Sequence, residues 1–380
     1  MDKFNVGVIG LGFIGCVHAR TISRLPQIKL AAVCDADIEL AKHKALEYGD
    51  CTVYSDYRQM LFDPSIKAIH NCTPNHLHYE INKLAIENGK NILSEKPLGM
   101  HSAETAELAK LASLNPKIAA GVNFNYRMYP LIQEYRKMIA YGELGSIRLV
   151  HGRFLQDWLM YDTDYNWRVD KSLSGSSRAM SDIGSHWCDL AQTLVSSRIS
   201  AVLADLTTVV PIRQKPVVNR QTFSSGIGER EPYSVDTEDY GAVMIKFDNG
   251  ARGVFYVSQV SGGHKCNIEI EVNTDLCSIA WNHQNSEQLW FGSRNKANKT
   301  ILRDPAAFKY AGKYTSLPPG HPEGFNDAFL NTLNAFYNHI IEGCENPRPD
   351  FATFEDGHYC MKLVDAILES SKNKTWVNVS

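Results

Sequence analysis

The stretch GLGFIG at residues 10–15 follows a run of β-forming residues, Phe4 to Ile9, and opens a helical pattern from Phe13 to Arg24. Asp35 ends the next strand-like run, about 20 residues after the last of these glycines. A strand, a glycine-rich turn, a helix and a later acidic residue are the setting of a dinucleotide-binding fingerprint. The alternative is a glycine-rich turn without a ligand, and the complete context favours the dinucleotide site.

Asp35 indicates which dinucleotide the turn would bind. A carboxylate at the end of the second strand accepts hydrogen bonds from both ribose hydroxyls of NAD and repels the 2′-phosphate of NADP. The residues that follow, Ala36 to Ile38, include no arginine or lysine that would offset this repulsion. We therefore expect NAD as the cofactor, although Asp35 could also cap the helix that starts near Asp37.

Strand-like and helical patterns alternate through the first third of the chain. β-rich runs occur at residues 4–9, 28–34, 67–72, 90–94 and 117–122, and helical patterns separate them at 13–24, 37–48, 76–88 and 102–113. Strands that alternate with helices of this length predict βαβ units and a parallel sheet. Because such crossovers are right-handed, residues 1–122 are expected to form a doubly wound, α/β Rossmann domain.

The second part of the chain has a different pattern. Helices are expected at 124–142, 184–197, 325–342 and 354–372, and strands at 147–154, 199–210, 238–248, 251–260, 266–273, 276–282 and 287–292. Consecutive strands with short turns, such as Asp248-Asn249-Gly250, predict antiparallel pairing. Residues 123–380 are therefore expected to form an α+β domain with a large open, mainly antiparallel sheet. The segment 211–235 shows no periodicity and is expected to be a long loop.

The composition excludes several classes of protein. The 380 residues are 44% hydrophobic and 21% charged, as in ordinary globular proteins, and the net charge of −3 gives no basic surface for nucleic acid. No apolar run reaches the roughly 18 residues that cross a bilayer, and no signal-peptide pattern precedes the first strand. The nine cysteines lack the spacing of a zinc site or a disulfide framework. We expect a cytoplasmic protein with no metal, membrane or nucleic-acid partner.

Two short motifs end later strands of the parallel sheet, where ligands of open α/β sheets bind. Thr73-Pro74-Asn75-His76 offers short polar side chains for a ribose or a carboxamide, but Asn75 could simply cap the next helix. Glu95-Lys96-Pro97 places an ammonium group at the cofactor crevice, where it could stabilise an alkoxide. The alternative for a lone lysine is a solvated surface position.

A third motif, Asp182-Ile183-Gly184-Ser185-His186, lies at the start of a predicted helix. Residues four apart share one face of a helix, so this carboxylate is expected beside the imidazole. A carboxylate in that position orients an imidazole and raises its basicity, which suits a general base. The alternatives are a helix cap for Asp182 and a buried core histidine for His186.

These motifs occur together in the order and spacing of one protein family. The glycine fingerprint, Thr73-Pro74-Asn75-His76, Glu95-Lys96-Pro97 and Asp182-x-x-x-His186 resemble those of the glucose–fructose oxidoreductase and inositol dehydrogenase family (Gfo/Idh/MocA) over essentially the whole chain. The resemblance implies a Rossmann domain followed by an α+β domain whose open sheet often mediates dimers or tetramers. It also implies a catalytic group of Lys96, Asp182 and His186, and a cis bond before Pro97.

Other stretches resemble the branch of this family that acts on pyranose sugars, anhydrosugars and glycosides, often at C3. Residues 156–158, 163–168 and 320–324 are rich in aromatic and hydrogen-bonding side chains, which suit the apolar faces and hydroxyl edges of sugars. Without the resemblance, Trp158 and Trp167 would be interpreted as core or interface aromatics. The predicted substrate contacts are Asn123, Tyr126, Arg127, Gln156, Asp157, Trp158, Trp167, Arg168 and His321. The predicted cofactor contacts are Gly10, Gly12, Phe13, Ile14, Gly15, Asp35, Thr73, Asn75, His78, Glu95 and Lys96.

The sequence therefore predicts an NAD-dependent dehydrogenase that oxidises a secondary hydroxyl of a pyranose or glycoside, with C3 as the expected position. His186 is expected to take the hydroxyl proton, Lys96 to stabilise the oxyanion, and Asp182 to position the imidazole or bind a neighbouring hydroxyl. An inositol dehydrogenase, a glycosidase that recycles bound NAD and a non-catalytic dinucleotide-binding regulator are the alternatives. The surplus of strands over terminal helices predicts an exposed apolar sheet face and, with it, a homodimer or homotetramer.

Overall fold

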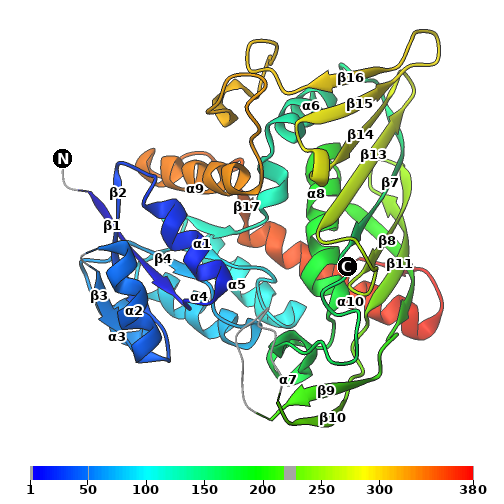
Figure 1. Cartoon of the computed structure of the whole chain (residues 1–380). Helices are drawn as coiled ribbons and strands as arrows, with labels where there is room; N and C mark the ends of the chain where they lie inside the picture. Colours follow the sequence, from blue (N-terminus) through cyan, green and yellow to red (C-terminus); the bar gives the residue numbers. More distant parts are fainter. Residues whose placement is uncertain (1–2, 50, 218–227, 380) are drawn as a thin grey trace.

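The computed structural model describes residues 3–49, 51–217 and 228–379 and is built around two large sheets (Figure 1). In the described ranges, the first sheet has the strand order β17-β6-β5-β4-β1-β2-β3. Its strands are β1 (Phe4–Ile9), β2 (Ile28–Cys34), β3 (Thr52–Tyr54), β4 (Ala68–Asn71), β5 (Asn91–Ser94), β6 (Ala120–Val122) and β17 (Ala352–Thr353). The pairs among β1 to β6 are all parallel, so the predicted Rossmann sheet is confirmed.

The helices of this part connect the parallel strands. They are α1 (Phe13–Ile22), α2 (Ile38–Tyr48), α3 (Tyr57–Phe62), α4 (His78–Glu87) and α5 (Ser102–Leu114). The alternation predicted four of them, together with the strands that flank them. The sequence interpretation missed β3 and α3, because three- and six-residue elements are too short to show a period.

The last third of the chain completes the core of this first sheet. Strand β17 pairs antiparallel with β6, and Phe351 packs so closely against Gly121 that a Cβ there would lie 2.9 Å from its ring. Helix α9 (Phe325–Ile341) contributes the buried residues Phe329, Leu333 and Phe336 to the same core. The division of the chain at residue 122 stays a prediction, but the first sheet depends on residues far beyond it.

The second sheet has the strand order β16-β15-β14-β13-β7-β12-β11-β8-β18 in the described ranges. Only β7 and β12 pair in parallel there, so the predicted mainly antiparallel sheet is confirmed. Its strands are β7 (Ile147–Leu155), β8 (Ile199–Thr207), β11 (Tyr240–Phe247), β12 (Arg252–Ser258), β13 (Asn267–Thr274), β14 (Ser278–Asn282), β15 (Gln288–Gly292), β16 (Lys299–Leu302) and β18 (Val377–Asn378).

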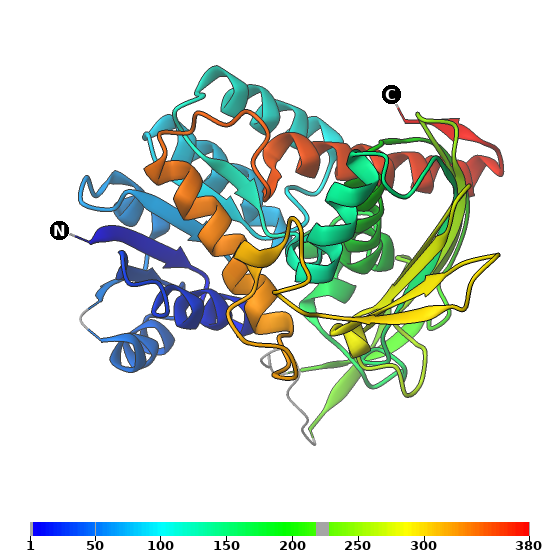
Figure 2. The ribbon, with the colours of Figure 1, turned by 90° about the horizontal axis from the view of Figure 1, so that it is seen from above.

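Helices cover one face of the second sheet, and Figure 2 shows none over the other face. The covering helices are α6 (Pro130–Ala140), α8 (Ser185–Val195) and α10 (Phe354–Asn373). Trp187 of α8 stacks on Phe255 of β12 with 4.3 Å between ring centroids, which fixes α8 on the sheet. No helix in the described ranges is long and apolar enough to cross a membrane.

The prediction of one long loop over 211–235 is wrong at both ends of the segment. Strands β9 (Ile212–Pro216) and β10 (Arg230–Ser234) form an antiparallel hairpin near the short helix α7 (Lys171–Ser174) (Figure 1). Residues 218–227 lie outside the described ranges. Hydrophobic periodicity missed this hairpin because the buried side chain of β9 is an arginine, Arg213.

Candidate active site

The glycine-rich turn has the geometry that the fingerprint predicts. Gly10 has a φ of +87°, and a Cβ there would lie 2.7 Å from the Cys72 carbonyl oxygen. A Cβ on Gly15 would lie 1.8 Å from the Gly10 carbonyl oxygen, so only glycine lets α1 approach the turn. A Cβ on Gly12 would meet no atom within 4 Å, which leaves open space above the turn.

This open space fits the pyrophosphate of a dinucleotide. Gly12 is the N-cap of α1 and offers no side-chain hydrogen bond to the first-turn amides, which are the groups that bind phosphate at helix N-termini. Asp35 lies beside the turn, since its Oδ2 accepts a hydrogen bond of 2.7 Å from the Leu11 amide. The cap of α2 is Asp37, which accepts from the amides of Glu39 and Leu40. Asp35 is therefore not the cap of that helix, and the residues of the turn suit NAD.

The polar residues after β4 form hydrogen bonds that hold the turn at the end of this strand. Thr73 Oγ1 donates to Asn71 Oδ1 at 2.7 Å, and Asn75 Nδ2 donates to the Ser174 carbonyl oxygen at 3.0 Å. The ring nitrogens of His78 lie 2.6 Å from the Pro97 carbonyl oxygen and 2.8 Å from that of Thr73. His78 thus links the turns that follow β4 and β5, and cofactor contact by these three predicted residues stays a prediction.

Glu95 is buried under the end of β5. Its Oε1 accepts hydrogen bonds from Asn123 Nδ2 at 2.6 Å and from His18 Nε2 at 2.9 Å. Burial raises the pKa of Glu95, but the hydrogen bond and charge of His18 outweigh it and leave the pKa at about 2. Glu95 is ionised, and its Oε2 accepts a hydrogen bond of 3.3 Å from the backbone amide of Lys96. Glu95 therefore holds both Asn123 and the backbone of Lys96.

The structure brings Lys96 and Asp182 together across the two parts of the chain. Lys96 Nζ donates to Asp182 Oδ1 at 2.8 Å and to the Asp182 carbonyl oxygen at 3.0 Å, and the Lys96–Pro97 bond is cis, as expected. Arg168 Nε lies 3.4 Å from the same Oδ1, and Gln259 Nε2 donates to Oδ2 at 2.8 Å. Burial raises the pKa of Asp182, but the charges of Lys96 and Arg168 outweigh it and hold the pKa well below its usual range.

His186 lies at the start of α8 in an aromatic cage. Its ring centroid is 5.6 Å from that of Phe124, 4.9 Å from that of Tyr126 and 6.3 Å from that of Phe154. Burial and the charge of Lys96 lower the pKa of His186 to about 3, although the charge of Asp182 opposes them. Its Nδ1 is buried without a hydrogen-bond partner. The imidazole is therefore neutral near pH 7, which is the protonation state that a general base must have before it reacts.

The expected carboxylate–imidazole pair differs in detail from the prediction. The predicted spacing assumes an α-helical turn, but residues Met180–Gly184 form a π-helical turn, in which residues five apart are bonded. Asp182 acts on His186 through its charge, while the hydrogen bonds recorded for its carboxylate come from Lys96 and Gln259. The carboxylate therefore orients the lysine rather than the imidazole.

The predicted substrate residues divide into two groups. Arg168 reaches Asp182 and stacks on Trp167 at 4.5 Å, and Trp158 Nε1 donates to Gln156 Oε1 at 2.7 Å. Tyr126 closes the cage of His186, with its hydroxyl 3.2 Å from Cys266 Sγ.

The other group has its polar atoms occupied elsewhere or exposed. Arg127 is paired with Asp189 and lies 3.4 Å from Asp356. Asp157 binds Lys265 at 2.7 Å, and His321 is exposed. Substrate contact by any of these residues stays a prediction.

Sequence reasoning missed several members of the cluster. Four members belong to no motif. Phe154, Gln259 and Cys266 lie in or next to β7, β12 and β13, which pair although they are far apart in sequence. Phe124 follows β6 of the first sheet. The position of Gln259 near the end of the predicted strand 251–260 is the one signal that it carried, and the observed strand β12 ends one residue before it. No cluster of three or more metal-ligating side chains occurs in the described part of the chain.

Comparison with known proteins agrees with this geometry. Residues 4–124 match the family model "Oxidoreductase family, NAD-binding Rossmann fold", and residues 132–280 match the "GFO/IDH/MocA C-terminal domain". Levoglucosan dehydrogenase of Pseudarthrobacter phenanthrenivorans is 31% identical over 100% of this chain and 99% of its own. D-glucoside 3-dehydrogenase of Escherichia coli is 25% identical over 100% of this chain and 98% of its own.

A solved structure gives the same result for the fold. Levoglucosan dehydrogenase in complex with NADH and L-sorbose has a TM-score of 0.90 to this structure, with 30% identity and complete coverage of both chains. The matched models cover both parts of the chain, and the glycine turn and Asp35 have the geometry of an NAD site. The chain is therefore an NAD-dependent oxidoreductase that belongs to the GFO/IDH/MocA family.

Proposed function

We propose that this protein oxidises a secondary hydroxyl of a pyranose sugar or glycoside to a ketone, at C3 of the ring. The observation that carries the proposal is the Lys96–Asp182 ion pair next to the neutral, buried imidazole of His186. Two relatives that match the whole chain are named for their action on levoglucosan and on D-glucosides, which supports a sugar substrate.

The residues divide the chemistry of alcohol oxidation between them. Because Nδ1 of His186 is buried, Nε2 is the nitrogen that accepts the hydroxyl proton. The ammonium of Lys96, held by Asp182, stabilises the negative charge that develops on the substrate oxygen. NAD, held by Gly10, Gly12, Gly15 and Asp35, supplies the hydride acceptor when bound.

In this proposal the sugar site is formed by the first group of predicted substrate residues, those around Arg168 and Trp158. Trp158 and Trp167 offer flat apolar surfaces for the C–H faces of a pyranose, and Gln156 and Arg168 offer hydrogen bonds to its hydroxyls. We assign Arg127 a structural role, because its guanidinium is buried and paired with Asp189.

A substrate screen tests the proposal. The purified protein is incubated with NAD and with pyranoses, anhydrosugars, glycosides and inositols, and reduced cofactor is followed by absorbance. We expect net NADH formation with a pyranose or glycoside, and a 3-keto product by NMR. Strongest activity with an inositol would assign a cyclitol dehydrogenase. Glycoside cleavage without net NADH would assign an NAD-recycling glycosidase, and cofactor binding without turnover would assign a regulator.

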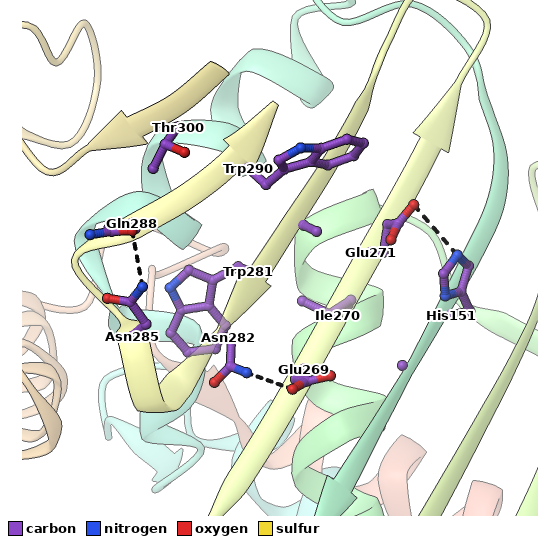
Figure 3. Close-up of a pocket in the computed structure, with 12 residues that line it drawn as sticks. His151, Glu269, Ile270, Glu271, Trp281, Asn282, Asn285, Gln288, Trp290 and Thr300 are labelled. Atoms are coloured by element: carbon purple, nitrogen blue, oxygen red, sulfur yellow. Dashed lines mark hydrogen bonds and ion pairs between the residues drawn. The ribbon is translucent and has the colours of Figure 1, made fainter. Parts of the chain in front are cut away.

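We also propose that the uncovered face of the second sheet packs against a second copy of this chain. Exposed apolar side chains lie on it, including Leu149, Met244, Val254 and Trp290. A depression of about 450 Å³ lies on this face (Figure 3). Within it, the His151 ring lies 3.6 Å from the Glu271 carboxylate, so this polar pair is formed within one chain before any second copy binds.

Cross-strand pairing makes this face continuous. One row of paired residues crosses eight strands: Leu203, Met244, Val254, His151, Glu271, Ala280, Trp290 and Thr300. We expect light scattering to show a dimer or tetramer, and Val254→Lys to dissociate it, because a lysine would be buried without a partner. Leu114→Lys on α5 is the control, as Leu114 is 68% exposed elsewhere. A wild-type monomer at micromolar concentration would contradict the proposal.

A further inference from the structure

A buried polar hub lies behind the catalytic cluster and consists of Arg178, Arg213 and Asp239. None of the three side chains has exposed surface. Asp239 Oδ1 accepts hydrogen bonds from Arg178 and, at 2.8 Å, from Arg213 Nη2. One carboxylate thus faces two guanidinium groups, and their remaining N–H groups need other oxygen acceptors in the interior.

The first arm of the hub ends at the catalytic carboxylate. Arg178 Nη1 donates to Gln259 Oε1 at 3.2 Å, and Gln259 Nε2 donates to Asp182 Oδ2 at 2.8 Å. An arginine can only donate, so it holds the oxygen of the Gln259 amide toward itself. The amide nitrogen is thereby turned toward Asp182, and Oδ1 of Asp182 remains for Lys96.

The second arm of the hub ends at the segment 159–164, which lies between the two tryptophans of the proposed sugar site. Arg213 Nη1 donates to the carbonyl oxygens of Tyr161 and Asp164, and its Nη2 donates to that of Leu159, each at 3.0 Å. This segment has no helix or strand, and residues 160–163 are exposed. It connects Trp158 to Trp167, and its other backbone hydrogen bonds are isolated ones, such as that from the Leu159 amide to the Gln259 carbonyl oxygen. Arg213 therefore supplies three of the hydrogen bonds that hold a segment without regular structure.

We propose that Gln259 and Arg213 are positioning residues for sugar oxidation. Gln259 fixes the orientation of the Asp182 carboxylate, and Arg213 fixes the segment 159–164 between the sugar-binding aromatics. Asp239 links the two arms, so the hairpin that carries Arg213 contributes to the choice of sugar. This inference rests on the proposed function of the site.

Gln259→Leu tests the first arm. The leucine replaces the glutamine with an apolar side chain of similar size and removes the donor to Asp182. We expect kcat to fall about tenfold, as for the loss of one hydrogen bond to a charged group. NADH affinity is expected to stay at the wild-type value. Gln259→Glu keeps the size, and its carboxyl can donate to Asp182 only when it is protonated. Its kcat is therefore expected to recover as the pH falls, a change in profile that a packing role would not produce.

Arg213→Lys tests the second arm. A lysine keeps a charge beside Asp239 but cannot reach three carbonyl oxygens at once. We expect the KM for the sugar to rise about tenfold, kcat to change less, and deuterium exchange at 159–164 to accelerate. Gln192→Leu is the control for both arms. Gln192 is a buried glutamine on α8, and its side chain accepts a hydrogen bond from the Ile199 amide, away from the hub.

The outcomes separate this inference from the proposed function. A wild-type protein that reduces no NAD with any sugar overturns the proposed function. In that case, the deuterium exchange rate at 159–164 in Arg213→Lys still tests whether Arg213 holds this segment. Unchanged exchange and unchanged KM in Arg213→Lys overturn the second arm. A kcat in Gln259→Leu equal to that of Gln192→Leu, with no altered pH profile in Gln259→Glu, overturns the first.

Discussion

His186 is the side chain on which the proposed chemistry depends most directly. His186→Ala is expected to lower kcat by about 10²–10⁴, the usual contribution of a general base, and to leave the NADH dissociation constant unchanged. His283→Ala is the matched control, because His283 packs against the same ring of Tyr126 at 5.2 Å while its Nδ1 lies 3.1 Å from the Cys266 carbonyl oxygen. Steady-state kinetics on folded variants decide the matter. Near-wild-type turnover in His186→Ala would end the assignment.

Asp35 is expected to set the choice of cofactor. The wild-type protein should prefer NAD over NADP by at least about tenfold in kcat/KM, because one close charge repulsion is worth ~1–3 kcal/mol. Asp35→Asn keeps an acceptor for the Leu11 amide and should remove most of this preference. Asp37→Asn, two residues away on the helix cap, should keep it. Equal efficiency of the two cofactors with the wild-type protein would refute the assignment.

The pairing of Lys96 with Asp182 in one cluster could be predicted because short motifs mark both residues, while their catalytic role stays a prediction. Lys96 and Asp182 lie in Glu-Lys-Pro and Asp-x-x-x-His, and the resemblance assigned them to one site. Gln259 and Arg213 were not predictable, since their roles depend on which strand ends meet in space. A fully buried arginine also contradicts the expectation that buried strand positions are apolar.

At the scale of elements, the turn between β1 and α1 contains glycines with two different roles: Gly15 allows close packing, and Gly12 leaves space for the cofactor. Gly15→Ala places a Cβ against the Gly10 carbonyl oxygen, so α1 must shift, and we expect a loss of ~1–3 kcal/mol in the free energy of unfolding. Gly12→Ala meets no protein atom, so it should lose at most about 1 kcal/mol, the cost of alanine in place of glycine at the N-cap of α1.

Cofactor binding tests the role of Gly12 separately from stability. The Cβ of Gly12→Ala would occupy the space into which the pyrophosphate fits, so NADH affinity should fall at least about tenfold. Urea denaturation and NADH titration measure the two quantities separately. A stable Gly15→Ala variant, or a Gly12→Ala variant that binds NADH normally, would contradict this division.

Element prediction succeeded where side-chain periodicity is strong and failed where backbone geometry departs from it. The alternation through β1, α1 and β2 predicted those elements nearly to their ends. The expected helix over 124–142 is a 3-10 helix, Asn125–Met128, followed by α6, because Pro130 starts a new helix at its first position. The π-helical turn before α8 leaves no pattern in the sequence, and it decides where the carboxylate of Asp182 points.

For the whole molecule, buried histidines are expected to limit stability in mild acid. His186 has a pKa of about 3 in the folded chain against an ordinary value of 6.5, so the unfolded chain takes up a proton first as the pH falls. The contribution is full above pH 6.5 and is lost progressively toward pH 3. His70 and His78 act in the same direction, because burial lowers their pKa values as well.

The size of this effect can be measured. From pH 7 to pH 5, His186 alone should cost about 2 kcal/mol of unfolding free energy. Urea denaturation at the two pH values gives the total, and His186→Gln should reduce the loss by about that amount. The lowered pKa values of Glu95 and Asp182 place their effects below this window. An unfolding free energy that is equal at pH 5 and pH 7 would contradict the argument.

The antiparallel strand β17 has a consequence for how the protein is made. When a ribosome has released the first 124 residues, β6 still lacks the neighbour that Ala352 and Thr353 later provide, and the cavity beside Gly121 still lacks Phe351. The nascent nucleotide-binding part must therefore wait for more than 220 further residues before its sheet has all its strands. During that interval its edge is open to chaperones and to other nascent chains, and the final step of folding comes only after nearly the whole message has been translated.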